Sequence, residues 1–144
     1  MESLRIAFFP LIRTTFDVPL AEEMIRQARI ALRTAGFEVI EPEKPINDLA
    51  QAQAAARDLL TSEVDLLLIY QATFADSTMV TALVENSEAP IFLWAIPEEW
   101  SGGRLRLNSL CGINLAGHAL TLRGRKYHYA YASPQDTLVY HNIR

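Results

Sequence analysis

Polar residues that could bind a small ligand come directly after two apolar runs of the chain. Arg13 follows the first of these runs, and Gln71 and Thr73 follow the run at residues 66–70. A guanidinium, an amide and a hydroxyl can together hydrogen-bond the oxygens of a polyol or a phosphate. We therefore predict ligand contacts at these three residues. The alternative is that both segments only lead into the helices that follow, with Asp76 as a helix cap.

A second group of candidates surrounds Trp100. This side chain lies in a polar stretch, where it could stack on a sugar ring or dock on a neighbouring subunit. Glu98 and Glu99 suggest acid–base chemistry, but adjacent side chains usually point apart, so we predict a solvated loop. Asn108 or Ser109 is expected to cap the helix that comes next.

That next helix carries four residues that predict a subunit contact or a ligand wall: Cys111, Gly112, Asn114 and Gly117. Asparagine and glycine lower helix propensity, and the two glycines would let another backbone approach closely. Cys111 has no obvious base beside it, so we predict a small buried thiol rather than a nucleophile. His118 is expected to be a partly buried packing residue.

Several kinds of chemistry lack their signature in this sequence. Neither GxGxxG nor GxxxxGK[ST] occurs, so there is no nucleotide-binding fingerprint. The three histidines have no companion at a spacing typical of metal ligands. We accordingly assign no catalytic residue, no metal ligand and no cofactor to the chain.

The composition narrows the class of protein further. The chain has 144 residues, with 13 Lys+Arg against 17 Asp+Glu and a net charge of −4. This mild acidity argues against a nucleic-acid or anionic-membrane surface. No apolar run approaches the roughly 20 residues that a membrane helix needs, no signal-peptide pattern opens the sequence, and a single cysteine cannot form an internal disulfide. We predict a cytoplasmic protein without membrane or nucleic-acid partners.

Apolar runs and helix-period segments alternate along the whole chain. Such alternation predicts an α/β fold with a parallel sheet covered by helices on both faces. We expect a flavodoxin-like, Rossmann-like three-layer sandwich with five parallel strands in the order 2-1-3-4-5, in which ligands bind at the carboxyl ends of the strands. The predicted strands are residues 4–9, 37–40, 65–70, 91–96 and 127–132, and the predicted helices start near residues 17, 47, 76 and 108.

The last twelve residues predict the start of another helix. Ser133 is a candidate cap, and Pro134 suits the first turn. The expected helix at 133–144 either covers the sheet or leads onward into a longer protein. We favour the second option, with residues 1–144 as one N-terminal domain.

Three stretches of the sequence resemble the N-terminal domain of the L-fucose isomerase and L-arabinose isomerase superfamily. They are QATFADSTM at 71–79, IFLW at 91–94 with a long loop after it, and LNSLCG at 107–112 with GRKY at 124–127. The order and spacing of the three stretches carry the resemblance, which spans nearly the whole chain. No histidine lies within 108–112, where arabinose isomerases place one, and this favours a fucose-isomerase-like relative.

The resemblance implies a metal-dependent aldose–ketose isomerase. In that superfamily manganese or a similar divalent ion is held by residues beyond the N-terminal domain, which supplies part of the sugar-binding wall and packs against other subunits. By analogy the partners are a small sugar, the C-terminal domains and other copies in a homo-oligomer, and the 144-residue chain alone should be inactive. The residues that the resemblance places on the sugar wall are Arg13, Gln71, Thr73, Asn108 and Ser109, and Trp100 is added as a further contact.

Two other functions fit the same sequence. A stand-alone sugar-binding module of flavodoxin-like or binding-protein-lobe type would bind its ligand without a metal ion. A purely structural domain would use the face around residues 111–117 to form an oligomer. The sequence does not identify which sugar is involved.

Overall fold

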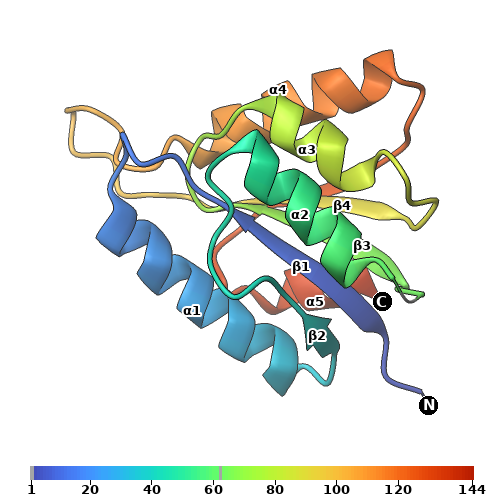
Figure 1. Ribbon diagram of the computed structural model, residues 1–144. Coiled ribbons are helices and arrows are strands. Elements are labelled where there is room, and N and C mark those ends of the chain that lie inside the picture. Colours follow the sequence, from blue (N-terminus) through green and yellow to red (C-terminus); the bar gives the residue numbers. More distant parts are fainter. Residues whose placement is uncertain (1, 62) are drawn as a thin grey trace.

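The computed structural model describes residues 2–61 and 63–144. In this part of the chain five strands alternate with five helices (Figure 1). The elements are β1 (Arg5–Leu11), α1 (Val18–Thr34), β2 (Glu38–Ile40), α2 (Leu49–Leu59), β3 (Leu66–Gln71), α3 (Ser77–Val84), β4 (Ile91–Ala95), α4 (Ser109–Leu122), β5 (His128–Tyr131) and α5 (Thr137–Ile143).

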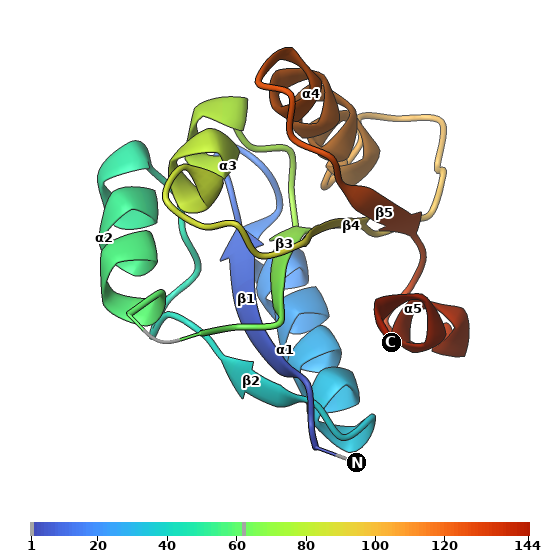
Figure 2. The ribbon, with the colours of Figure 1, turned by 90° about the vertical axis from the view of Figure 1, so that its right-hand side faces the viewer.

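The strands form one parallel sheet in the order β2-β1-β3-β4-β5. Helices α2, α3 and α4 cover one face, and α1 and α5 cover the other, which gives three layers (Figure 2). The predicted flavodoxin-like fold and strand order are confirmed. The sheet edges are β2 and β5, and no helix among the described residues is long and apolar enough to cross a membrane.

The central strand β3 explains why the order could be predicted. All six of its residues are buried, as the sequence LLLIYQ suggests for a strand that is covered on both faces. Alternate side chains supply the two halves of the core: Leu67 and Ile69 face α2, α3 and α4, whereas Leu68 and Tyr70 face α1 and α5.

On the α1 and α5 side the core is aromatic. The rings of Tyr70 and Trp94 meet edge to face with centroids 4.8 Å apart. Their polar atoms are paired, since Tyr70 Oη donates to Met24 O at 3.1 Å and Trp94 Nε1 donates to Ala132 O at 2.9 Å. Burial raises the pKa of Tyr70 well above its usual value, and it raises the pKa of Tyr140 to about 12.

The last helix begins later than the sequence predicts. Ser133 does not cap it; the Ser133 hydroxyl accepts the N–H of Gln135 at 3.1 Å within a preceding turn. Asp136 is the cap, because its carboxylate accepts the N–H of Leu138 at 3.0 Å. The serine hydroxyl is satisfied inside the turn, so the helix starts four residues further along.

Candidate functional site

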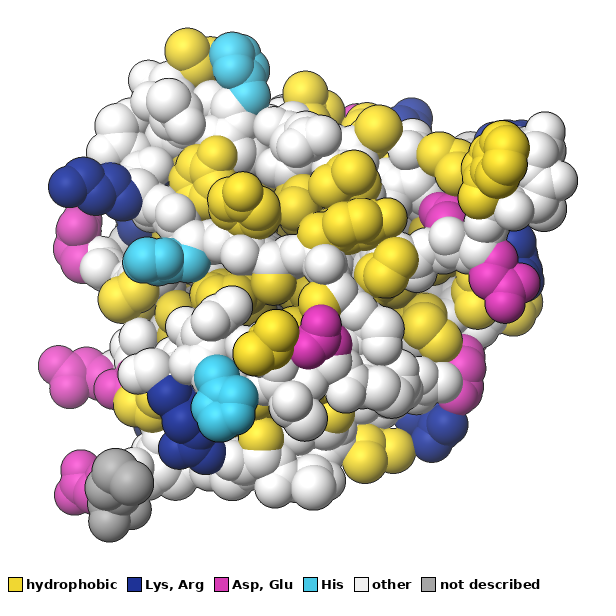
Figure 3. Space-filling view, turned by 180° about the vertical axis from the view of Figure 1, so that it is seen from behind, with side chains coloured by type: hydrophobic (Ala, Val, Ile, Leu, Met, Phe, Trp, Pro, Cys, Tyr) yellow, Lys and Arg dark blue, Asp and Glu magenta, His cyan; other side chains and the backbone are white. Residues whose placement is uncertain are grey.

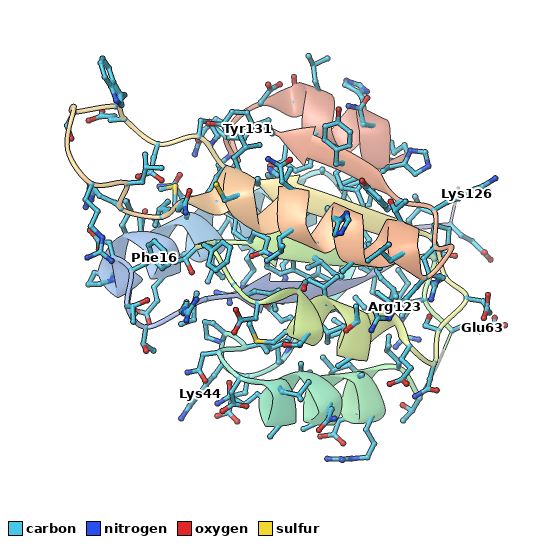
Figure 4. The ribbon with its side chains drawn as sticks, turned by 90° about the horizontal axis from the view of Figure 1, so that it is seen from above. Phe16, Lys44, Glu63, Arg123, Lys126 and Tyr131 are labelled. Atoms are coloured by element: carbon cyan, nitrogen blue, oxygen red, sulfur yellow. The ribbon has the colours of Figure 1, made fainter. Side chains whose placement is uncertain are left out.

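Three loops meet at the carboxyl ends of the strands, where a ligand of this fold is expected to bind. The loop after β1 joins the loop after β3, since the N–H of Arg13 donates to Thr73 Oγ1 at 2.7 Å. The N–H of Phe74 donates to Leu107 O in the loop after β4 at 2.7 Å. Phe16 and Phe74 lie with ring centroids 6.3 Å apart, and Figure 4 shows Phe16 on the side where the loop after β4 projects.

Gln71 is the most unusual residue at this edge. It ends β3 and has no exposed surface. Among the described residues neither its Nε2 nor its Oε1 has a hydrogen-bond partner. A buried amide without partners costs about 1–3 kcal/mol relative to a satisfied one, and buried polar groups are nearly always paired by protein or water. The Gln71 amide is therefore the strongest local indication of a polar group that this chain does not supply.

The first turn of α4 leaves room for that amide. Gly112 is buried beside it, and a Cβ at this position would lie 2.5 Å from Gln71 Oε1. One turn later, Gly117 lies directly against the hydroxyl of Tyr127. The two glycines thus allow close approach of side chains from the same chain. Among the four residues predicted to form an interface, Cys111 and Asn114 are exposed.

Neither of the two residues predicted to cap α4 makes a capping hydrogen bond with its side chain. Asn108 occupies the cap position with φ 54° and ψ 38°, but its side chain makes no capping bond. The Ser109 hydroxyl accepts the N–H of Ile96 at 2.9 Å and donates to Gln71 O. Ser109 therefore ties α4 to the ends of β3 and β4. Of the two predicted caps, Asn108 does occupy the N-cap position, but it caps without a side-chain hydrogen bond, and the Ser109 hydroxyl points back to the sheet.

Thr73 and Arg13 differ in how far their side-chain polar groups are already engaged within the chain. The Thr73 hydroxyl is buried and engaged, because it also donates to Phe74 O at 2.8 Å. The Arg13 guanidinium lies 3.7 Å from Asp76 and 5.8 Å from the Phe74 ring centroid, and about half of its side chain is exposed. Asp76 is the N-cap residue of α3, as predicted, but its side chain makes no capping hydrogen bond. Arg13 is thus a cation at this edge that a ligand could reach, as is the exposed Arg104, whose guanidinium lies 5.9 Å from the Phe16 ring centroid.

Glu98 fixes the long loop after β4. Its carboxylate accepts three successive backbone N–H groups, those of Arg106 at 2.5 Å, Leu107 at 3.0 Å and Asn108 at 2.8 Å. Consecutive N–H groups of this kind form an anion-binding concavity. The prediction that Glu98 is merely solvated is wrong. No pattern in the sequence marks this role, since it depends on how the loop folds back over ten residues.

A second link joins this loop to the start of α1. Arg106 pairs with Asp17 at 2.7 Å, and the N–H of Asp17 donates to Arg106 O at 3.0 Å. Asp17 caps α1 as well, and the N–H of Leu20 together with the Arg106 guanidinium holds the pKa of Asp17 below its usual value. Between these two anchors Trp100 is 86% exposed. It stands at the end of a braced loop, free to contact another molecule.

Cys111 and His118 lie on the outer side of α4 and not on the side that faces the sheet. Cys111 and His118 are exposed, whereas both were predicted to be wholly or partly buried. The reason is that α4 carries small or apolar residues all around, so its periodicity does not show which side faces the sheet.

The carboxyl edge carries hydrogen-bonding groups, exposed guanidinium groups and an exposed indole. Within residues 2–61 and 63–144 no group of three or more His, Cys, Asp or Glu side chains lies close enough to hold a metal ion.

These features define a flavodoxin-like domain with polar and aromatic side chains at the carboxyl edge of its sheet. Residues 8–140 match the family described as "Fucose/sulfoquinovose isomerase, N-terminal domain". The chain belongs to this family, and the predicted membership is confirmed.

Three relatives show how much of a complete protein this chain represents. It is 27% identical over 136 residues to a protein of Priestia megaterium, 29% over 136 residues to one of Alkalicoccus urumqiensis and 27% over 145 residues to one of Clostridium sp., each named sulfoquinovose isomerase. The matches cover 94%, 94% and 99% of this chain but 30%, 30% and 32% of the relatives. The chain thus spans about a third of the length of these proteins.

Proposed function

We propose that this chain forms part of the sugar-binding wall and of a subunit contact in a metal-dependent aldose–ketose isomerase of the L-fucose isomerase type. The divalent ion, manganese or a similar one, and the residues that carry out the isomerisation belong to parts of the enzyme other than these 144 residues. The observation that carries the proposal is the family match over residues 8–140, in relatives about three times as long.

The carboxyl edge of the sheet supports the substrate role. The fully buried Gln71 amide lies directly beneath this edge and could shape the wall from below, and the exposed Arg13 guanidinium could bind an anionic substituent or a hydroxyl oxygen. Trp100 offers an apolar surface for a sugar ring. Asn108 and Ser109 act mainly by holding α4 in register with the sheet, so we expect them to shape the wall rather than to dominate the contact.

The relatives narrow the substrate class. They are named for sulfoquinovose, and we infer that the natural substrate is an aldose of this kind, a hexose with an anionic substituent, or a close analogue such as L-fucose. Arg13 is placed to favour an anionic sugar, because half of its side chain is open to solvent, and the exposed Arg104 beside Phe16 is a second candidate for the same role.

The test uses the pure 144-residue chain with manganese and each of sulfoquinovose, L-fucose and L-arabinose. We expect no ketose by NMR, and weak binding at most, with amide shifts confined to Arg13, Gln71 and the loop around Trp100. Turnover by this chain would contradict the assignment of catalysis to other residues. Tight, saturable binding without metal in a calorimetric titration would favour the stand-alone sugar-binding module instead.

A further inference from the structure

Three exposed arginines lie at the carboxyl edge of the sheet. Arg104 and Arg106 belong to the loop after β4, and Arg13 belongs to the loop after β1. Figure 3, the view from behind, shows basic and acidic side chains interspersed along this margin, on the right. The cation that an anionic ligand can use therefore depends on which of the three is already paired with a carboxylate.

Two of these arginines have a carboxylate close by. Arg106 Nη2 lies 2.7 Å from Asp17 Oδ2, and Arg106 Nε donates to the same oxygen at 2.8 Å. Arg13 Nη1 lies 3.7 Å from Asp76 Oδ1, which is a looser contact. A guanidinium that already gives two donors to a carboxylate must break that contact before it can bind another anion through both donors. Arg106 is thus committed to bracing the loop, and the charge of Arg13 is partly balanced.

Arg104 is oriented by an aromatic ring and not by a carboxylate. Its side chain makes no ion pair or hydrogen bond within residues 2–61 and 63–144, and its guanidinium carbon lies 5.9 Å from the centroid of the Phe16 ring. Phe16 in turn packs on Phe74, with ring centroids 6.3 Å apart. Stacking on a ring orients a guanidinium and leaves the N–H groups in its plane free to donate. Arg104 is therefore an oriented cation whose donors are unused.

The backbone that carries Arg104 is fastened by Glu98. The Glu98 carboxylate accepts the N–H groups of residues 106–108, so the returning arm of the loop is held two residues beyond Arg104. The carbonyl of the middle residue of these three accepts the N–H of Phe74, the residue that supports Phe16. One carboxylate thus holds both the arm that carries Arg104 and the contact to the rings on which its guanidinium lies.

We propose that Arg104 determines the preference of the sugar-binding wall for a substrate with an anionic substituent, and that Glu98 is its positioning residue. Two oxygens of a sulfonate, phosphate or carboxylate group would accept two parallel N–H donors of the Arg104 guanidinium. Glu98 acts through the loop and does not touch the ligand. The inference rests on the proposed function and names the residue that recognises the charge of the substrate.

The experiment titrates the 144-residue chain with two small probes of similar shape, the methanesulfonate anion and the neutral dimethyl sulfone. NMR follows the Nε–Hε group of Arg104. We expect saturable binding of methanesulfonate in about the millimolar range and none of dimethyl sulfone. Arg104→Gln should weaken methanesulfonate binding by at least about tenfold, the loss expected when a charge-assisted hydrogen bond is removed. Arg123→Gln is the matched control: Arg123 is exposed at the other end of α4, and its substitution should change the affinity by less than about twofold.

A second pair of variants tests the positioning role. Glu98→Gln and Glu99→Gln remove the same charge from adjacent residues, but Glu98 is the one bonded to residues 106–108, whereas Glu99 is exposed. Loss of a nearby negative charge alone would strengthen anion binding in both variants. Positioning predicts opposite signs: Glu98→Gln should weaken methanesulfonate binding by about threefold to tenfold and speed hydrogen exchange of amides 106–108, while Glu99→Gln should strengthen binding slightly. Circular dichroism and thermal melting check that each variant folds.

The two parts of the proposal fail in different ways. Equal affinity of the wild type and Arg104→Gln for methanesulfonate, or equal binding of the two probes, would overturn the role of Arg104. Tighter methanesulfonate binding in both glutamate-to-glutamine variants would overturn the positioning role of Glu98. None of these measurements uses a sugar or a metal ion, so their outcome is separate from a failure of the proposed function, which is tested with sugars.

Discussion

Helices α1 and α4 pack on opposite faces of the same sheet, yet their outer sides differ completely. On α1, Glu23 accepts hydrogen bonds from Arg26 and Gln27, while Arg29 and Arg33 both pair with Glu41. On α4 no charged side chain is present. The comparison shows that burial against the sheet constrains only the inner side of a helix. The outer side of α1 carries paired charges, whereas that of α4 carries no Asp, Glu, Lys or Arg.

The largest predicted effect concerns the inner sides, where the two helices should behave alike. Leu32 of α1 and Leu120 of α4 are fully buried. Leu32→Ala and Leu120→Ala should each lower the free energy of unfolding by about 2–5 kcal/mol, since each removes buried methyl groups and leaves a cavity. Urea denaturation measures this loss. A loss below about 1 kcal/mol for Leu120 alone would mean that α4 is loosely held in the isolated chain.

The next effect concerns a glycine that only α4 has on its inner side. Gly112→Ala gains about 1 kcal/mol of helix propensity but places a methyl group 2.5 Å from Gln71 Oε1. Because Gln71 is fully buried, overpacking should dominate, with a net loss of about 1–2 kcal/mol in urea denaturation. In a Gln71→Ala background the same substitution should become neutral or stabilising. Equal effects in both backgrounds would show that the amide does not need this space.

A smaller effect tests the outer side of α1. Glu41→Gln removes the carboxylate shared by Arg29 and Arg33 and should cost at most about 1 kcal/mol. The difference between wild type and variant should shrink in about 1 M NaCl, which screens exposed charges. Thermal melting of both proteins at low and high salt would show whether the difference shrinks, and an unchanged difference would contradict an ionic contribution.

The smallest effect is a response to acid. Hydrogen bonds from Arg26 and then Gln27 lower the pKa of Glu23 to about 2, and the pKa of Asp17 is also lowered. Both groups have a lower pKa folded than unfolded, so their contribution is complete above the unfolded value of about 4 and is lost as the pH falls toward 2. An NMR titration should show the Glu23 carboxyl still ionised near pH 3. Its protonation near pH 4 would mean that the Arg26 contact is absent in solution.

The sheet could be predicted well because a buried strand consists of consecutive apolar residues, which the sequence shows directly. The apolar run at residues 66–69 is typical of a strand covered on both faces, and the alternation with helices then favoured the order that the structure has. The sides of α4 could not be predicted in the same way. Since apolar residues surround the helix, Cys111 and His118 were assigned to the inside, although both lie outside.

The candidate site was predicted in position but not in detail. Arg13, Gln71 and Thr73 do meet at the carboxyl edge, because the parallel topology brings strand ends together. Their individual states depend on the path of the loops. Thr73 is engaged by the neighbouring loop, Gln71 is left unpaired, and Glu98 closes the loop over ten residues. Contacts between residues so far apart leave no local pattern.

The closure by Glu98 has a thermodynamic consequence for recognition. A ten-residue loop held by three N–H groups on one carboxylate, and braced by Arg106 against Asp17, loses its conformational freedom when the chain folds. A ligand that arrives later meets a preorganised surface and has little chain entropy left to remove. Under the proposed function, selectivity at this edge follows from the fit of rigid contacts, and a change at Glu98 should alter that selectivity without touching the ligand.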